Sequence, residues 1–312
     1  MTGPATTLAI HGGAGTLNPA SITPAEKQAL RNGLTKALVA GHRVLAAGGP
    51  ALDAVAAAVM ALEDDEQFNA GRGAVFTSAG LQEMDAAIMD GATSRAGAVA
   101  GIAGPRNTVQ AARAVMERSP HVLLAGEGAL AFLRAQGVPF EDDAYFRTEK
   151  RWATLQSVLA SREQGREIDD FDRHGTVGAV ARDHAGNLAA ATSTGGMTGK
   201  LPGRIGDTSI PGAGTWADRT CAFSATGHGE SFIRIAAGHE LSARLRLAGE
   251  TLPGAASAVM ATLASIGGTG GFVAIDHSGQ VAMPFNTRGM YRGVVTQDTP
   301  PRTAIYKEEL QP

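Results

Sequence analysis

The residue pair with the clearest chemical potential lies mid-chain, at Gly175-Thr176. A polar stretch precedes the pair, and an apolar, strand-like run from 176 to 181 follows it. A threonine at a new N-terminus would offer a hydroxyl nucleophile and, in its own amine, a base. The preceding glycine has no side chain to obstruct attack on its carbonyl in a strained turn. The pattern predicts self-cleavage between these residues, and the alternative is a threonine that simply begins a strand.

Two charged residues downstream could hold an amino-acid substrate. Arg204 and Asp207 lie three positions apart in a loop punctuated by Gly and Pro. Arginine binds a carboxylate through two parallel hydrogen bonds, and an aspartate can hold an ammonium group. The pair would therefore bind the α-carboxylate and α-amine of an amino acid, unless it is an ordinary surface ion pair.

Further hydroxyl and backbone groups could assist. Thr194 ends the expected partner strand, where its hydroxyl could bond the nucleophile, although threonine also favours strands for other reasons. The hydroxyl of Thr226 and the N–H of Gly227 precede an expected helix and could stabilise an oxyanion, unless they form an ordinary turn. We expect His228 to shape the pocket, because an amine base makes a catalytic histidine unnecessary.

Composition excludes several classes of protein. The 312 residues are 44% hydrophobic and 18% charged, enough for a large core. The net charge of −3 argues against nucleic-acid or membrane-surface partners. The single cysteine, Cys221, excludes an intrachain disulfide and a cysteine metal cage. The start of the chain shows no leader pattern, and no run approaches the roughly 20 apolar residues of a membrane span. We therefore expect a cytoplasmic protein.

The pattern of elements favours antiparallel sheets covered by helices. We expect strands at 6–10, 74–77, 84–89, 96–102, 176–181, 187–192, 271–275 and 280–283, and helices at 23–47, 50–62, 107–118, 231–247 and 252–266. The runs 74–77 and 84–89 are interpreted as a hairpin. Residues 137–173 are interpreted as a mobile linker with a possible helix at 152–160. Strands in hairpins and helices in separate blocks predict a layered α+β sandwich.

Seven motifs occur in one order along nearly the whole chain. They are His11-Gly12-Gly13-Ala14-Gly15, Phe68-Asn69-Ala70-Gly71-Arg72-Gly73, Met84-Asp85-Ala86, Gly175-Thr176-Val177-Gly178-Ala179-Val180, Ser193-Thr194-Gly195-Gly196, Gly203-Arg204-Ile205-Gly206-Asp207 and Thr226-Gly227-His228-Gly229-Glu230. This combination resembles the plant-type L-asparaginase / isoaspartyl peptidase family of N-terminal-nucleophile (Ntn) hydrolases. The resemblance implies a four-layer αββα sandwich with two stacked, mainly antiparallel sheets, made as an inactive precursor.

The resemblance also implies subunits and residue roles. Residues 1–175 would become an α subunit ending in the mobile linker 137–175, and residues 176–312 a β subunit. Both would form one structural domain, and two such heterodimers would associate as (αβ)2. By the same resemblance Thr176 is the nucleophile and Thr194 supports it. Arg204 binds the substrate α-carboxylate and Asp207 its α-amine. Thr226 and Gly227 bind the substrate as an oxyanion hole, and Asn69 lies near the cleavage site.

The resemblance extends to a cation and a reaction. Residues 62–72 resemble the family's sodium-binding loop, whose ligands are backbone carbonyls. The expected ligands are the carbonyls of Leu62, Glu63, Asp65, Phe68, Ala70 and Arg72. No cofactor is expected for catalysis. The implied reaction is hydrolysis of β-aspartyl amide bonds in isoaspartyl dipeptides and L-asparagine, releasing L-aspartate. The alternatives are a glycosylasparaginase-like amidase and an uncleaved binding protein for small amino acids.

Overall fold

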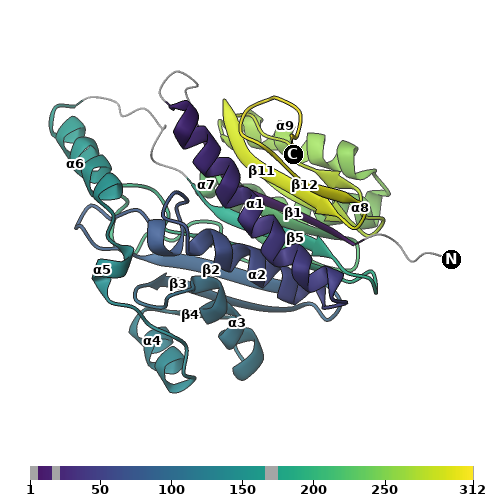
Figure 1. The fold of residues 1–312 in the computed structure, drawn as a ribbon, viewed down its shortest axis with the longest axis horizontal. Coiled ribbons are helices and arrows are strands. Elements are labelled where there is room, and N and C mark those ends of the chain that lie inside the picture. Colours follow the sequence, from purple (N-terminus) through teal and green to yellow (C-terminus); the bar gives the residue numbers. More distant parts are fainter. Residues whose placement is uncertain (1–5, 16–21, 166–174, 312) are drawn as a thin grey trace.

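The computed structural model describes residues 6–15, 22–165 and 175–311, which form two stacked sheets between layers of helices (Figure 1). The large sheet has the order β12-β11-β1-β5-β6-β2-β3-β4 and is antiparallel except for the pair β3–β4. The small sheet has the order β10-β9-β8-β7 and is antiparallel throughout. The strands are β1 (Thr7–Gly15), β2 (Met84–Asp90), β3 (Arg95–Ile102), β4 (Leu123–Ala125), β5 (Val177–Arg182), β6 (Leu188–Thr194), β7 (Thr215–Ala217), β8 (Cys221–Gly227), β9 (Gly270–Asp276), β10 (Val281–Ala282), β11 (Gly289–Thr296) and β12 (Thr299–Ala304).

Helices cover the outer faces of both sheets (Figure 1). The helices of the described residues are α1 (Pro24–Ala46), α2 (Ala51–Glu63), the short 3-10 helix η1 (Gly71–Gly73), α3 (Thr108–Arg118), α4 (Gly126–Ala135), α5 (Asp143–Phe146), α6 (Glu149–Glu163), α7 (Gly229–Ile235), α8 (Ala237–Ala248) and α9 (Leu252–Ser265). The helices α1, α2 and α3 bury their apolar faces on the large sheet, and α7, α8 and α9 on the small sheet. Within the described ranges, none of these helices combines the length and apolar character needed to cross a bilayer.

A third apolar layer lies between the two sheets. Val180 and Ala190 contribute from the large sheet, and Ala222 and Val273 from the small one, all fully buried. Small side chains allow the sheets to approach closely, which is consistent with the scarcity of aromatic residues in the sequence. The four layers confirm the α+β sandwich predicted from the sequence.

The first helix begins as its sequence predicts. The hydroxyl oxygen of Thr23 accepts a hydrogen bond from the Glu26 N–H at 3.2 Å, and Glu26 Oε2 accepts one from the Thr23 N–H at 2.9 Å. This reciprocal pair satisfies two N–H groups that the helix itself cannot. The stripe of Leu30, Leu34 and Leu38 is buried against the large sheet.

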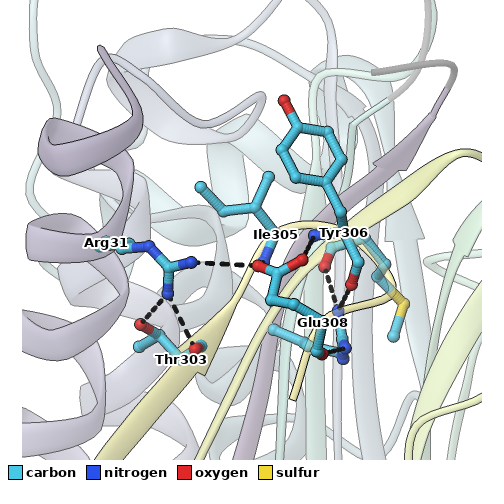
Figure 2. A network of polar contacts seen from close by, with 7 residues as sticks. Arg31, Thr303, Ile305, Tyr306 and Glu308 are labelled. Atoms are coloured by element: carbon cyan, nitrogen blue, oxygen red, sulfur yellow. Dashed lines mark hydrogen bonds and ion pairs between the residues drawn. The ribbon is translucent and has the colours of Figure 1, made fainter. Parts of the chain in front are cut away.

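A polar network ties α1 to the end of the chain (Figure 2). Arg31 donates to the Thr303 carbonyl at 2.9 Å and to Glu308 Oε1 at 3.0 Å. The Glu308 carboxylate also accepts the N–H groups of Ile305 and Tyr306, each at 2.8 Å. Burial opposes ionisation, but these N–H groups and Arg31 lower the pKa of Glu308 below its usual range. The network fixes β12 beside β11, and β11 in turn pairs with β1.

Two predicted features of the middle of the chain are wrong. Residues 74–77 do not form a strand, and β2 pairs with β3 and β6 instead. The apolar run is nevertheless buried, because the Val75 N–H bonds Asn69 Oδ1 and Thr77 pairs with Lys200 in an isolated bridge. These residues are buried by packing between loops and not by strand pairing in a sheet. The apolar pattern of the sequence does not distinguish the two cases.

The described part of the expected linker, 137–165, is also more ordered than predicted, although the helix predicted at 152–160 is confirmed as part of α6. It contains α5 and α6, and α6 begins where the Thr148 hydroxyl accepts the Arg151 N–H. Leu155 and Val158 are buried, and Trp152 packs edge-on against Phe76. The remaining linker residues, 166–174, lie outside the described residues. The expected helix 231–247 is instead two helices, divided at Ala236, whose φ is 48°.

Candidate active site

The Gly175-Thr176 peptide lies directly before β5, where three side-chain contacts converge on it. The Thr176 hydroxyl donates to Thr194 Oγ1 at 3.2 Å. The Thr194 hydroxyl donates to the Gly175 carbonyl oxygen at 3.0 Å, and Asn69 Nδ2 donates to the same oxygen at 2.7 Å. Two donors on one carbonyl oxygen polarise it and would stabilise the negative charge that develops on attack.

The amide of Asn69 is held in place by its other contacts. Its nitrogen also donates to the Gly196 carbonyl at 2.7 Å, and its oxygen accepts the Val75 N–H at 3.0 Å. These bonds define which end of the amide faces Gly175. Asn69 therefore lies where the sequence placed it, beside the expected cleavage site.

A glycine of β1 provides room for this peptide. The register between β1 and β11 shifts between His11 and Gly13, a bulge of the kind found beside active sites. Gly13 has a φ of +120°, and a Cβ there would lie 3.1 Å from Gly175 Cα and 3.5 Å from the Thr176 nitrogen. Both its backbone conformation and the close approach of the Gly175-Thr176 peptide therefore require glycine at position 13.

Thr176 opens onto a small pocket. Its lining includes Thr194, Arg204, Asp207 and Gly227, four of the residues singled out in the sequence. These residues come from separate segments of the chain: the end of β6, the loop between β6 and β7, and the end of β8. The structure thus brings the expected nucleophile and the expected substrate-binding residues together.

Arg204 is already paired inside this pocket. Its Nε donates to Glu230 Oε1 at 3.0 Å and its Nη2 donates to Glu230 Oε2 at 2.8 Å. Burial opposes ionisation of Glu230, but the hydrogen bonds and charge of Arg204 lower the pKa of Glu230 to about 2. His228 Nε2 also lies 3.4 Å from Glu230 Oε2. Glu230 is therefore ionised at neutral pH and orients the guanidinium.

The side chain of Asp207 is buried, and one of its two carboxylate oxygens, Oδ2, has no hydrogen-bond partner within the described residues. Burial raises the pKa of Asp207 to about 7. The charge of Arg204 opposes this rise, and the nearby Glu230 and Asp85 carboxylates add to it. A substrate ammonium would supply the missing positive charge and donors, since a buried carboxylate is stable only when paired.

Of the two residues expected to form an oxyanion hole, Gly227 lines the pocket and Thr226 is buried beside it. Gly227 has a φ of +137°, a backbone conformation that favours glycine. The hydroxyl oxygen of Thr226 accepts the Ala14 N–H at 3.0 Å. Its own hydroxyl proton can still be donated, and the bond to Ala14 fixes the oxygen beside the glycine loop of β1.

In the loop expected to bind sodium, the carbonyl oxygens of Glu63 and Phe68 lie close to Gly71 and Gly73. A Cβ on Gly71 would lie 2.6 Å from the Glu63 carbonyl oxygen, and one on Gly73 would lie 2.6 Å from that of Glu66 and would overlap that of Phe68. The Glu63 side chain points elsewhere, accepting from Ser193 Oγ at 2.6 Å and the Val109 N–H at 2.9 Å.

The remaining expected ligands of this loop belong to the same run of turns. The carbonyls of Leu62, Asp65, Phe68 and Ala70 each accept one N–H within the loop, which leaves a second lone pair on each oxygen. Arg72 lies inside η1. The ranges that the structure describes contain no group of three or more His, Cys, Asp or Glu suited to a metal. Carbonyl oxygens fit a hard cation such as sodium, by the donor preferences of such ions.

Two residues with direct contacts in the site were not assigned a role from the sequence. His11 Nδ1 lies 2.8 Å from the Thr176 carbonyl oxygen, and Glu230 holds Arg204. Both belong to motifs that were recognised, but a motif does not reveal which atoms meet when more than 160 residues separate His11 from Thr176.

Comparison with known proteins identifies the family of this chain. The family model described as asparaginase matches residues 4–305. The chain belongs to the asparaginase family. Relatives in this family include the isoaspartyl peptidase of Salmonella typhimurium, 47% identical over 96% of this chain and 98% of the relative. The isoaspartyl peptidase of Escherichia coli is 46% identical over 97% and 96%. The plant-type L-asparaginase of Pyrobaculum calidifontis is 43% identical over 92% and 96%. Like these relatives, this asparaginase-family chain is a hydrolase.

Proposed function

We propose that the chain hydrolyses β-aspartyl amide bonds, in isoaspartyl dipeptides and in L-asparagine, after cutting itself between Gly175 and Thr176. The proposal depends on the surroundings of the Gly175 carbonyl oxygen. This oxygen accepts hydrogen bonds from Asn69 and Thr194 while the Thr176 hydroxyl lies beside it, at the opening of a pocket with Arg204 and Asp207.

Cleavage begins when Thr176 Oγ attacks the Gly175 carbonyl carbon. The proton of the hydroxyl leaves through Thr194, to which Thr176 donates. The C–N bond breaks as the Thr176 nitrogen takes up a proton, which leaves Gly175 joined to Thr176 as an ester. Water hydrolyses that ester, so that Gly175 gains a carboxylate and Thr176 keeps its hydroxyl and a free amine. The amine then serves as the base in each turnover.

Turnover repeats the same chemistry on the substrate. Arg204 binds the α-carboxylate and Asp207 the α-ammonium, which places the β-amide carbon at Thr176 Oγ. The amine of Thr176 accepts the hydroxyl proton and returns it to the leaving group, either ammonia or an amino acid. The Gly227 N–H and the Thr226 hydroxyl stabilise the oxyanion. Water then hydrolyses the β-aspartyl ester and releases L-aspartate.

Substrate assays test this proposal directly. We expect the cleaved protein to release aspartate from both a β-aspartyl dipeptide and L-asparagine. Arg204→Ala should raise KM and lower kcat/KM on both substrates by about 10- to 100-fold, the value of a hydrogen-bonded charge pair. An unchanged kcat/KM in this variant would remove Arg204 from the substrate site. Preferential hydrolysis of a glycosylated asparagine would instead favour a glycosylasparaginase-like amidase.

We further propose that residues 62–72 hold a structural sodium ion through the carbonyls of Leu62, Glu63, Asp65, Phe68, Ala70 and Arg72. Two of these carbonyl oxygens, those of Glu63 and Phe68, lie close to Gly71 and Gly73, which supports this site. A bound ion stabilises only the folded state, so the unfolding midpoint should rise with sodium concentration. Melting in sodium chloride and in choline chloride at equal ionic strength measures this, and identical midpoints would contradict the site.

The assembly we propose is (αβ)2, two heterodimers of residues 1–175 and 176–312. The resemblance to the family supports it. Light scattering of the cleaved protein should give the mass of two complete chains, and the mass of one chain would contradict the assembly.

A further inference from the structure

The ring of His11 bridges the expected nucleophile and the small sheet. His11 lies in β1, pairs with Gly178 of β5, and is fully buried. Its Nδ1 lies 2.8 Å from the Thr176 carbonyl oxygen, and its Nε2 lies 2.8 Å from Ser224 Oγ in β8. Burial lowers the pKa of His11 to about 3, although the bond to Thr176 opposes this. The ring is therefore neutral at the pH where the enzyme would work.

The direction of each hydrogen bond follows from this neutrality. A carbonyl oxygen only accepts, so Nδ1 carries the ring proton and donates it to Thr176. The other nitrogen, Nε2, must then accept the Ser224 hydroxyl proton. Ser224 Oγ in turn accepts from the Thr192 hydroxyl at 2.7 Å. Thr215 Oγ1 lies 2.7 Å from Thr192 Oγ1 and 3.0 Å from the Thr208 carbonyl oxygen, and its one hydroxyl proton serves only one of them. An ordered chain of donors thus runs from Thr192 of β6 through Ser224 of β8 and His11 of β1 to the residue that we propose as nucleophile.

Gly178 keeps the space in which this chain forms. A Cβ on Gly178 would overlap Ser224 Oγ and approach His11 Nε2 to 2.5 Å. Its φ is not in the left-handed region, so the requirement for glycine here is one of space and not of backbone conformation. Side-chain polar groups fill a position between the sheets that apolar residues fill elsewhere in the same layer.

We propose that His11, held by Ser224 and Thr192, is a positioning residue for Thr176, a role that rests on the proposed function of Thr176 as nucleophile. In the uncut chain Thr176 is tethered on both sides. Cleavage frees its amine side, and the carbonyl side must then hold the hydroxyl and the new amine in place. Because His11 fixes that carbonyl, it limits rotation about the Cα–C bond that carries both groups. Misplacement of reacting groups by about 1 Å costs about 10²-fold in rate.

Two substitutions of His11 test this role, because each replaces only one of the two ring nitrogens. The amide nitrogen of asparagine reaches the position of Nδ1, whereas that of glutamine reaches the position of Nε2. His11→Asn keeps the bond to Thr176 and loses the bond to Ser224, so we expect it to lower kcat per cleaved chain about tenfold, as loss of the Ser224 hydroxyl would, and we expect His11→Gln to lower kcat about 100-fold. The KM should change by less than about threefold in both variants, because Arg204 and Asp207 are untouched.

A second pair of variants covers the case in which His11 substitutions do not fold. Ser224→Ala removes the donor to Nε2, and Ser242→Ala removes an equally buried hydroxyl that bonds Asp218 on the far side of the small sheet. We expect Ser224→Ala to lower kcat per cleaved chain and the rate of chain cleavage by about tenfold, and Ser242→Ala to change neither. Assays below the unfolding midpoint of each variant separate this effect from lost stability.

Equal kcat values for Ser224→Ala and Ser242→Ala, or for His11→Asn and His11→Gln, would overturn the positioning role. Failure of the underlying proposal has a different signature. If Thr176→Ala still hydrolyses the substrates, Thr176 is not the nucleophile. If Thr176→Ala is inactive while His11→Gln and Ser224→Ala are fully active, only the positioning role of His11 is wrong.

Discussion

Arg204 and Glu230 meet in two hydrogen bonds of 3.0 and 2.8 Å, so the guanidinium expected to bind substrate already holds a carboxylate. Because Glu230 fixes the orientation of Arg204, we expect Glu230→Ala to raise KM about three- to fivefold and to leave kcat largely unchanged, the modest effect of a partly exposed pair. Steady-state kinetics with L-asparagine measure this. Glu240→Ala, which breaks a comparable pair with Arg244, is the matched control. A lower KM in Glu230→Ala would mean that Glu230 competes with the substrate.

Asp207 should give substrate binding a dependence on pH. Burial raises the pKa of Asp207 to about 7 in the free protein. The charges of Glu230 and Asp85 also raise this pKa, and the charge of Arg204 lowers it. Substrate ammonium requires the ionised carboxylate, so KM should rise as pH falls through 7, by about tenfold per unit well below it. Asp207→Asn should raise KM about 10- to 100-fold and remove this dependence. A wild-type KM that is flat from pH 5 to 8 would contradict the assignment.

Asn69 should matter for chain cleavage more than for turnover. Its Nδ2 donates at 2.7 Å to the oxygen on which negative charge develops when Thr176 attacks Gly175. Loss of one such donor lowers the rate of the reaction that it assists by about 10²- to 10³-fold. The Asn69→Ala variant should therefore cleave its own chain more slowly by that factor. Denaturing gels of freshly purified protein, followed over days, measure the rate. Gln82→Ala, which removes amide bonds to the Ala74 and Phe146 carbonyls, is the control. Cleavage of both variants at the wild-type rate would exclude the role.

Gly178→Ala tests the packing between the sheets. Its Cβ would overlap Ser224 and approach His11, and overpacking of this kind costs about 1–3 kcal/mol. Unfolding should be measured in a Thr176→Ala background, so that every variant is a single chain. Gly128→Ala is the control, since a Cβ there meets nothing within 4 Å and its helix should be unchanged or slightly stabilised. A Gly178→Ala variant as stable as Gly128→Ala would show that the two sheets can move apart at this point.

Local signals in the sequence predicted much of the fold. The capping box of Thr23 and Glu26 defines the start of α1, and the hairpin of β5 and β6 follows from alternating strands around a turn. These features depend on residues close in sequence. The pairing of β1 with both β11 and β5 does not, because its partners lie far along the chain. The predicted strand 74–77 is wrong because the partners of this buried run, Asn69 and Lys200, lie in loops and not in a strand.

The candidate site was predictable in its residues and not in its contacts. Thr176, Arg204 and Asp207 have side chains whose chemistry by itself indicates a role. Glu230 and His11 act through partners that only the fold brings near. The raised pKa of Asp207 likewise depends on burial among residues from three separate segments, which no spacing in the sequence records.

The central claim is that Thr176 becomes an N-terminal nucleophile, and intact mass spectrometry of purified protein tests it most directly. We predict that wild type separates under denaturing conditions into two chains that end at Gly175 and begin at Thr176. Their masses should together exceed that of the uncut chain by the mass of one water molecule, and Thr176→Ala should remain uncut and inactive. A wild-type protein that hydrolyses β-aspartyl dipeptides while its mass stays that of the intact chain would contradict the account.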